Sequence, residues 1–219
     1  NDYLSYKGSR TDFLGFDNGA RAIPAEDNLP FFASIIGNPQ GEQALRYREV
    51  LENFNPHMAA VKQKSFIDYN FGSSFGNQIP LKKLTLGYNL GFSYKNNTEF
   101  YKNAEYGRYG MSSDPDVTEL EVREFQKGDY GVNSVLLSGL AGFAVKTLKS
   151  KYRINIIHLQ NGESKAGIFD YDGSDQGSIF SGYQHNLEYS QRSLTNILLD
   201  GKHSFQKGKW DLIWKLSPT

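Results

Sequence analysis

The chain has 219 residues, equal numbers of basic and acidic side chains (24 each) and no cysteine. The balanced charge argues against a nucleic-acid partner, because such proteins carry a basic surface. Without cysteine there are no disulfides, no thiol chemistry and no cysteine-ligated metal. The mean hydropathy of -0.56 and the lack of a long apolar run exclude a transmembrane helix. They are compatible with an outer-membrane β-barrel, whose lumen and loops are polar.

The first part of the chain predicts irregular structure with one helix. Residues 1–6 predict a short strand, and residues 7–65 show many glycines and prolines but no sustained alternation, which is typical of turns. Within this stretch, residues 41–54 carry apolar side chains at helical spacing and predict a short helix. So long an irregular stretch counts against a compact soluble domain and favours a large external loop of a barrel.

Beyond residue 65, apolar and polar side chains alternate in six further segments. The sequence therefore predicts about seven antiparallel strands in all. The six segments cover residues 65–76, 84–94, 132–147, 151–160, 183–199 and 210–219. A slip in the alternation near Ser193 predicts a β-bulge.

The predicted connections alternate between long and short. Long external loops are expected near residues 7–65, 95–131 and 161–182, and short turns near residues 77–82, 148–150 and 200–209. Outer-membrane barrels have this asymmetry, with short periplasmic turns and long extracellular loops. Soluble sandwiches instead have connections of mixed length at both ends.

The segment 84–94, LTLGYNLGFSY, indicates which medium surrounds the sheet. Its alternate residues place leucines and aromatics on one face and only threonine, glycine, asparagine and serine on the other. A soluble sheet carries charges on its wet face, whereas a strand between lipid and a watery lumen has this pattern. Its residues, at about 3.3 Å each and tilted by roughly 45°, span ~25 Å, the height of an outer-membrane apolar band.

The expected fold is an all-β, antiparallel transmembrane β-barrel that is only partly present. Bacterial single-chain barrels have even strand numbers, because an open edge in lipid leaves backbone groups unsatisfied. With an odd number of strands, we expect residues 1–219 to form one β-barrel segment of a longer protein, with the closing strands after Thr219.

Three pieces of the sequence resemble the front part of the barrel of Bacteroidetes-type TonB-dependent receptors. They are DFLGFDNGARAIP (12–24), LGYNLGFSYK (86–95) and LEYSQRSLTN (187–196) with GKH (201–203). In that family the first piece belongs to the first external loop, just after the plug. The resemblance implies a 22-stranded barrel in the outer membrane of a Gram-negative bacterium, importing a nutrient when the TonB complex pulls the plug. The implied partners are outer-membrane lipid, the TonB complex through a plug not contained in these residues, and a surface lipoprotein.

One candidate metal site lies in the acidic sequence FDYDGSDQG. Asp170, Asp172 and Asp175 could give carboxylate oxygens to Ca²⁺, which prefers oxygen ligands. An EF-hand loop starting at Asp170 would need glutamate at its twelfth position, where the chain has Ser181. The alternative is a solvated acidic loop with Asx turns.

A second candidate site is an aromatic and cationic surface for a sugar, a peptide or a siderophore. Its residues are Tyr101, Tyr106, Arg108 and Tyr109. The alternative is that they are ordinary interfacial aromatics, which outer-membrane barrels carry anyway.

Neither catalysis nor a cofactor is predicted. His185 and Ser193 share a strand face but lie ~26 Å apart at about 3.3 Å per residue, too far for a nucleophile and its base, and no GxSxG motif occurs. Trp210 and Trp214 are predicted to be an interfacial or lipid-facing pair. Glu188 is expected to line the lumen with Arg192 and to pair with neighbouring charges.

Three classes of function are compatible with these patterns. The first is a fragment of an energy-coupled nutrient receptor, and the second is a structural or secretion-associated outer-membrane barrel. The third is a soluble ligand-binding β-barrel whose apolar face points inward. A plug and a TonB box upstream would separate the first two, and solubility of the folded protein without detergent would favour the third.

Overall fold

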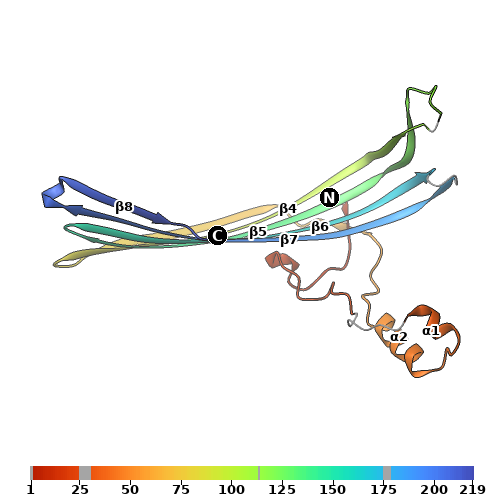
Figure 1. Ribbon diagram of the computed structural model, residues 1–219, viewed down its shortest axis with the longest axis horizontal. Helices are drawn as coiled ribbons and strands as arrows, with labels where there is room; N and C mark the ends of the chain where they lie inside the picture. The colour runs from red at the N-terminus through yellow and green to blue at the C-terminus, as the bar shows by residue number, and fades with distance from the viewer. Residues whose placement is uncertain (1, 25–30, 113, 175–178) are drawn as a thin grey trace.

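The protein is built around one open antiparallel sheet of six strands, as its computed structural model shows (Figure 1). The structure describes residues 2–24, 31–112, 114–174 and 179–219. Each strand of the sheet pairs with its neighbours in the chain, so the outermost strands are open edges. The strands are β3 (Tyr69–Pro80), β4 (Leu84–Met111), β5 (Leu120–Thr147), β6 (Ser150–Gly173), β7 (Phe180–Phe205) and β8 (Trp210–Leu216). The predicted all-β antiparallel architecture is therefore confirmed, and the sheet does not close into a barrel.

The strands are much longer than the sequence pattern predicts. Residues 95–111 and 120–131, expected in a long loop, are paired parts of β4 and β5, and most of residues 161–182 belong to β6 and β7. The alternation of apolar residues fades there because both faces of the extensions carry polar side chains, while backbone pairing continues regardless of side-chain type. The short turns are found at 81–83, 148–149 and 206–209, the last including the 3₁₀ helix η3 (Gln206–Gly208).

We divide the sheet into two halves along its strands and distinguish its two faces. The turn half comprises residues 69–94, 137–160 and 193–216, next to the short turns, and the far half comprises the described residues of 95–136 and 161–192. Face 1 carries Leu90, Ala141 and Ile156, which lie side by side on neighbouring strands, and face 2 carries the intervening residues such as Gly91 and Leu140. Because side chains alternate along a strand, this register assigns every regular position to a face.

The N-terminal segment covers face 1 of the far half. The predicted strand at the N-terminus is present as β1 (Asp2–Ser5), but it pairs with β2 (Val61–Lys64) in a separate two-stranded sheet. Leu4, which is 2% exposed, packs with Ala60, the residue before β2, and with Ala166 of β6. Partly buried apolar side chains of the big sheet complete this core: Phe100, Ile168 and Leu187.

Two short helices project from this segment, away from the sheet (Figure 1). They are α1 (Phe32–Ile36) and α2 (Glu42–Glu52), and the 3₁₀ helix η1 (Asp12–Leu14) precedes them. The helix predicted for residues 41–54 is confirmed by α2, whereas α1 was not predicted because five residues are too few to show a helical period. In the part of the chain that the structure describes, no helix is long and apolar enough to cross a membrane.

The bulges lie in β4 and β5 and not in β7. The prediction near Ser193 is wrong, because β6 and β7 keep one register through the pair Gln160–Ser193. Between Tyr101 and Ala104 of β4, two residues face one of β5, and Asn103 has a left-handed φ of 52°. Its N–H donates to Asp129 Oδ1 at 2.9 Å, and asparagine tolerates this conformation better than most residues. A second register shift follows Arg108.

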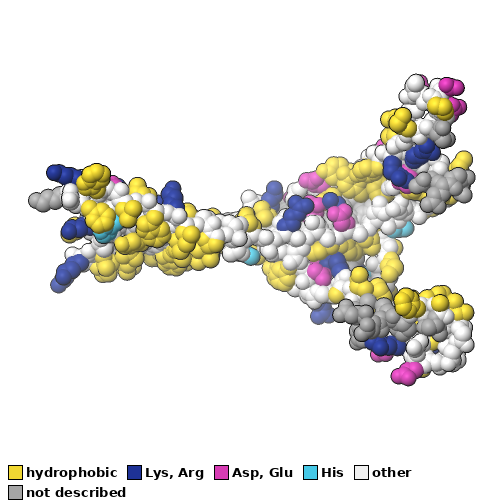
Figure 2. Space-filling view, in the orientation of Figure 1, with side chains coloured by type: hydrophobic (Ala, Val, Ile, Leu, Met, Phe, Trp, Pro, Cys, Tyr) yellow, Lys and Arg dark blue, Asp and Glu magenta, His cyan; other side chains and the backbone are white. Residues whose placement is uncertain are grey.

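Apolar side chains of the turn half gather on face 1. Figure 2 shows them along the lower side of the half that carries β8. They remain exposed to solvent in the isolated sheet: Phe75 is 63% exposed, Phe143 51% and Trp210 69%. No other part of the protein covers these rings among the described residues.

Candidate functional site

Four aromatic side chains meet on face 2 of the far half and form what we call the aromatic cluster: Tyr101, Tyr106, Tyr130 and Phe169. Tyr101 stacks on Tyr130 with ring centroids 4.6 Å apart and planes 14° apart. Tyr106 meets the edge of Phe169 at 5.7 Å and lies 6.3 Å from Tyr130. Residues 101 and 106 would lie on opposite faces of a regular strand, and the bulge at Lys102 and Asn103 brings them to the same face.

A hollow of about 660 Å³ adjoins this cluster, and its charged walls are mostly acidic. Glu99, Glu163 and Glu188 line it together with Lys165. Lys165 Nζ lies 3.0 Å from Glu163 and 3.7 Å from Glu188. Glu99 accepts a hydrogen bond from the Tyr101 hydroxyl. One ammonium group thus stands among three carboxylates.

Tyr101 and Tyr130 of the cluster stay neutral over the ordinary pH range. The hydrogen bond with Tyr106, and then partial burial, raise the pKa of Tyr130 to about 12. The hydrogen bond to Glu99, followed by the repulsion of that carboxylate, raises the pKa of Tyr101 above its usual value of 10.0. The hydrogen bond to Glu163 holds the pKa of Lys165 above its ordinary value of 10.5. The charge of the hollow is therefore set by its carboxylates and this single ammonium.

Sequence analysis identified two of the four residues of this cluster. Of the four predicted residues, Tyr101 and Tyr106 come together in it. Arg108 instead forms an ion pair with Glu124 at 2.6 Å, and Tyr109 lies on the opposite face, next to Gly107. Tyr130 and Phe169 were missed because they fall in segments expected to be loops, and only the register of β5 and β6 places them beside Tyr101.

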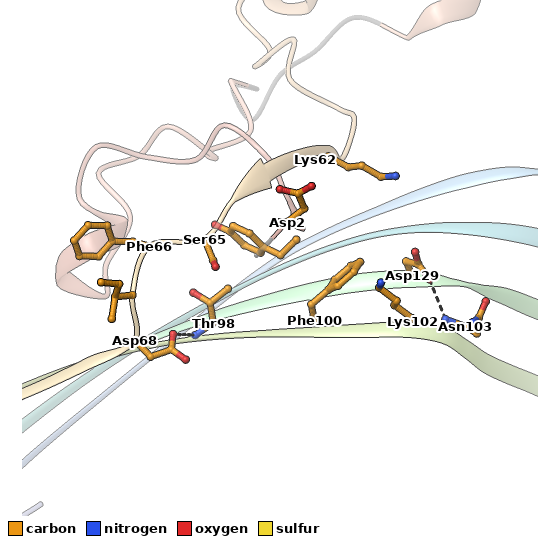
Figure 3. Close-up of a pocket in the computed structure, with 12 residues that line it drawn as sticks. Asp2, Lys62, Ser65, Phe66, Asp68, Thr98, Phe100, Lys102, Asn103 and Asp129 are labelled. Carbon is orange, nitrogen blue, oxygen red and sulfur yellow. Dashed lines mark hydrogen bonds between the residues drawn. The ribbon is translucent and has the colours of Figure 1, made fainter.

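A larger hollow of about 910 Å³ lies between the small β1–β2 sheet and β4 (Figure 3). Phe100 and Thr98 of β4 line one side of it, and Asp2 and Lys62 of the small sheet line the other. The Thr98 N–H donates to Asp68 Oδ1 at 2.7 Å, which ties the entry to β3 against β4. Its acidic and basic groups are mixed, so the hollow favours no charge of ligand.

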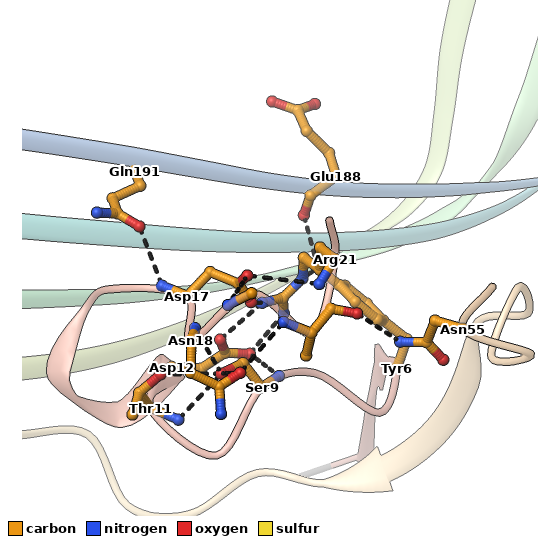
Figure 4. A network of polar contacts seen from close by, with 12 residues as sticks. Tyr6, Ser9, Thr11, Asp12, Asp17, Asn18, Arg21, Asn55, Glu188 and Gln191 are labelled. Atoms are coloured by element: carbon orange, nitrogen blue, oxygen red, sulfur yellow. Dashed lines mark hydrogen bonds and ion pairs between the residues drawn. The ribbon is translucent and has the colours of Figure 1, made fainter. Parts of the chain in front are cut away.

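The segment DFLGFDNGAR is folded around the guanidinium of Arg21 (Figure 4). Arg21 binds both oxygens of Asp12, at 2.8 and 2.6 Å, and Asp17 Oδ1 at 2.6 Å. Its Nε donates to the hydroxyl of Tyr6 at 3.2 Å, and its guanidinium lies 4.0 Å from the ring centroid of Tyr189 on β7. Two carboxylates and two rings thus enclose one cation, a geometry that arginine fits and lysine does not.

Electrostatics within this arrangement favour the charged forms of Arg21 and Asp17. Burial works to lower the pKa of Arg21, but the hydrogen bond to Asp12 and the contacts with Tyr6 outweigh it and raise the pKa. Burial likewise opposes ionisation of Asp17, and the hydrogen bonds from Arg21 and from the Gly19 N–H outweigh it and lower the pKa of this carboxyl.

Hydrogen bonds to face 1 dock this Arg21-centred loop on the sheet. Gln160 of β6 donates to the Gly15 carbonyl at 2.6 Å, and Tyr94 of β4 donates to the Phe13 carbonyl at 2.7 Å. A Cβ added to Gly162 would lie only 2.6 Å from Gly15 Cα, so the close approach requires glycine there. The loop that the sequence placed outside the barrel wall is therefore bound tightly to one face of the sheet.

Charge divides the two faces of the turn half sharply. Face 1 carries no Asp, Glu, Lys or Arg at any of its turn-half positions, all of which are described. Face 2 carries Arg153 paired with Asp200 at 2.9 Å, and Lys202 paired with Asp211 at 2.6 Å. Its remaining charged side chains are Lys146, Lys151 and Lys215. Trp210 and Trp214 were predicted to lie on the same side of their strand, and both lie on face 1.

The remaining predicted residues do not assemble into a site. Asp172 accepts a hydrogen bond from the Ser181 hydroxyl at 2.6 Å, Asp170 is exposed on the same strand, and Asp175 lies outside the described residues. Across the described ranges, no group of three His, Asp or Glu side chains could hold a metal ion. His185 accepts a hydrogen bond from the Ala60 N–H at 3.2 Å through Nδ1. Glu188 faces Lys165, in line with the expected charge pairing.

These features define an all-β protein with an open antiparallel sheet, an uncharged apolar band on one face of its turn half and charged side chains on the opposite face. Comparison with protein-family models finds no match to this sequence, and the curated proteins searched contain no match either.

Proposed function

We propose that the turn half of the sheet is part of the wall of an outer-membrane β-barrel, with face 1 against lipid and face 2 toward the lumen. The observation that supports this most strongly is the charge division of the turn half. There face 1 is uncharged and mostly apolar across six strands, and every charged side chain of the paired strand positions points to face 2. A charge on the lipid face of such a barrel costs about 2–4 kcal/mol at the bilayer midplane. A soluble sheet has no such reason to exclude charge from one exposed face.

The open edges fit the same proposal. β3 and β8 each leave one row of backbone groups without a strand partner in the described sheet. In lipid such groups need partners, so the proposed wall continues into further strands at both edges. The far half, where charges lie on both faces, then stands beyond the membrane in water.

We further propose that this barrel is an energy-coupled nutrient receptor of the TonB-dependent class. The resemblance of residues 12–24, 86–95 and 187–196 to that class supports it, and so does the docking of the first of these segments on the sheet. A structural or secretion-associated barrel would share the charge division. Energy-dependent uptake of a ligand by cells that carry the whole protein, lost when TonB is removed, distinguishes the receptor from that alternative.

The two tryptophans offer a direct test of the membrane position. Trp210 and Trp214 are the chain's only tryptophans, and both lie on face 1. With the full chain folded in vesicles, we expect phospholipids brominated on their acyl chains to quench their fluorescence and iodide in the buffer to leave it nearly unchanged. Strong quenching by iodide without quenching by brominated lipid would contradict the proposal and favour a soluble sheet.

A pair of variants tests the faces at one depth. Phe143 on face 1 lies opposite Tyr88, and Asn89, the next residue of β4, points to face 2. We expect Phe143→Arg to destabilise the protein in vesicles by about 2–4 kcal/mol, and Asn89→Arg to cost less than about 1 kcal/mol. Urea unfolding in vesicles measures both. Equal costs would mean that the faces do not differ in their surroundings.

A further inference from the structure

The two halves of the sheet carry opposite charge. Among the described side chains, basic ones outnumber acidic ones by nine to two in the turn half, and acidic ones outnumber basic ones by twelve to seven in the far half. The whole chain is balanced, so its net charge hides this separation. A surface with an excess of one charge raises the local concentration of counter-ions and steers ligands of opposite charge toward it. The far half therefore attracts cations.

The aromatic cluster stands within this acidic half. Its hollow joins ring surfaces to three carboxylates, and of the described residues that line it only Lys165 is cationic. Aromatic faces attract cations through the ring quadrupole, and carboxylates accept charge-assisted hydrogen bonds from ammonium and guanidinium groups. Tyr101 and Tyr106 are 42% and 49% exposed, so ring surface remains open to a ligand.

We infer that the hollow beside the aromatic cluster binds an organic cation, an ammonium or guanidinium group such as basic peptide side chains and polyamines carry. This inference rests on the proposed function, since it names the class of substrate for the face that we assign to the lumen. Tyr101 and Tyr106 supply ring surface, and Glu163 and Glu188 supply the hydrogen-bond acceptors. Lys165 already occupies part of both carboxylates, so the ligand's cation competes with it.

An anionic ligand fits this hollow poorly. It would have to approach Lys165, which lies within 3.7 Å of both Glu163 and Glu188, and the excess of carboxylates would repel it. A neutral sugar would use the rings but would gain nothing from the charges. Aromatic residues alone would be compatible with a cationic, an anionic or a neutral ligand. The charge of the walls favours the cationic one.

Agmatine, which carries one ammonium and one guanidinium group, is a suitable probe. We expect it to bind the full chain folded in detergent micelles, measured by isothermal titration calorimetry, while glutarate does not bind. Glu188→Gln and Tyr106→Leu should each weaken agmatine binding by about fivefold. Lys165→Met should strengthen agmatine binding, because the substitution removes the cation that competes for the carboxylates. If the hollow bound anions instead, the same substitution would weaken binding, because Lys165 would be the group that holds the anion.

Two matched controls make the same kind of substitution outside the hollow. Glu105→Gln removes a carboxylate of the far half that pairs with Lys127 outside the hollow, and Tyr109→Leu removes a ring of β4 from the opposite face. Both should leave agmatine binding unchanged. Equal loss in Glu188→Gln and Glu105→Gln, or weaker binding by Lys165→Met, would overturn the inference.

The tryptophan measurement keeps the two proposals apart. If brominated lipid quenches Trp210 and Trp214 and agmatine fails to bind, the cation site is wrong and the membrane wall stands. If brominated lipid does not quench them, the assignment of face 2 to a lumen is wrong whatever agmatine does.

Discussion

Replacing Arg21 with alanine should release the N-terminal loop from the sheet. The guanidinium makes ion pairs with Asp12 and Asp17 and lies against the ring of Tyr189, and its side chain is only 20% exposed. Breaking a buried ion pair costs about 3–5 kcal/mol, largely because a charge is left without its partner. Because a fifth of this side chain still meets water, we take the lower end, about 3 kcal/mol, which is roughly a hundredfold in the docking equilibrium.

Amide hydrogen exchange within the loop measures this equilibrium directly. The N–H groups of Leu14 and Gly15 donate to backbone carbonyls of the same loop, each at 2.9 Å. When the loop opens, these bonds break, so the exchange rates report how often it opens. We expect Arg21→Ala to reduce their protection by about a hundredfold, while protection in the strands of the big sheet stays the same.

Two further arginine variants make the result specific. Arg21→Lys keeps the charge but loses the fork that binds Asp12 through two bonds, so its protection should fall between those of the wild type and Arg21→Ala. Arg10→Ala removes an exposed arginine of the same loop for which the described contacts contain no ion pair, and it should have little effect. Equal protection of these amides in Arg21→Ala and Arg10→Ala would show that the guanidinium of Arg21 does not hold the loop on the sheet.

Two other predictions concern the same docking. Gly162→Ala should loosen the loop by about 1–3 kcal/mol, because the new Cβ would meet Gly15 Cα at 2.6 Å, and Gly139→Ala, which has open space, should not. The same exchange measurement compares the two, and an equal response would mean that the close approach is absent. The pKa of Asp17 is lowered in the folded protein. The stabilisation that this carboxylate gives to the docked loop is therefore complete above pH 3.8, its ordinary pKa, and is lost as the pH falls through the lower pKa of the folded state. Proteolysis of residues 2–24 should therefore rise only below about pH 4, and Asp17→Asn should raise it already at pH 7; a rise near pH 6 in the wild type would point to another group.

The period-2 pattern succeeded wherever one face of a strand is apolar. The segment 84–94 and its partners on the neighbouring strands were predicted correctly because leucines and aromatics occupy alternate positions. The helix within residues 41–54 was predicted correctly because its apolar residues follow the helical period. The pattern failed in residues 95–111, 120–131 and 161–173, where the strands continue with polar side chains on both faces. Backbone pairing holds these extensions together, and it leaves no periodic trace in the sequence.

The candidate site illustrates the same limit. Tyr101 and Tyr106 could be singled out because they lie close together in a tyrosine-rich stretch, but the sequence also grouped them with Tyr109, which points to the other face. Whether two residues of one strand share a face depends on the bulge at Asn103, and its left-handed backbone is not evident from the residue type. Phe169 reaches the cluster only through the register of two further strands.

By itself, the sequence determined that this protein is an antiparallel β-sheet protein with an apolar strand face and short turns at one end, because those features follow from the order of side chains along each strand. Only the tertiary structure decided that the first loop folds around Arg21 onto face 1 and that an aromatic, acidic hollow forms on face 2. Both depend on strand register, which is fixed by contacts between residues far apart in the chain.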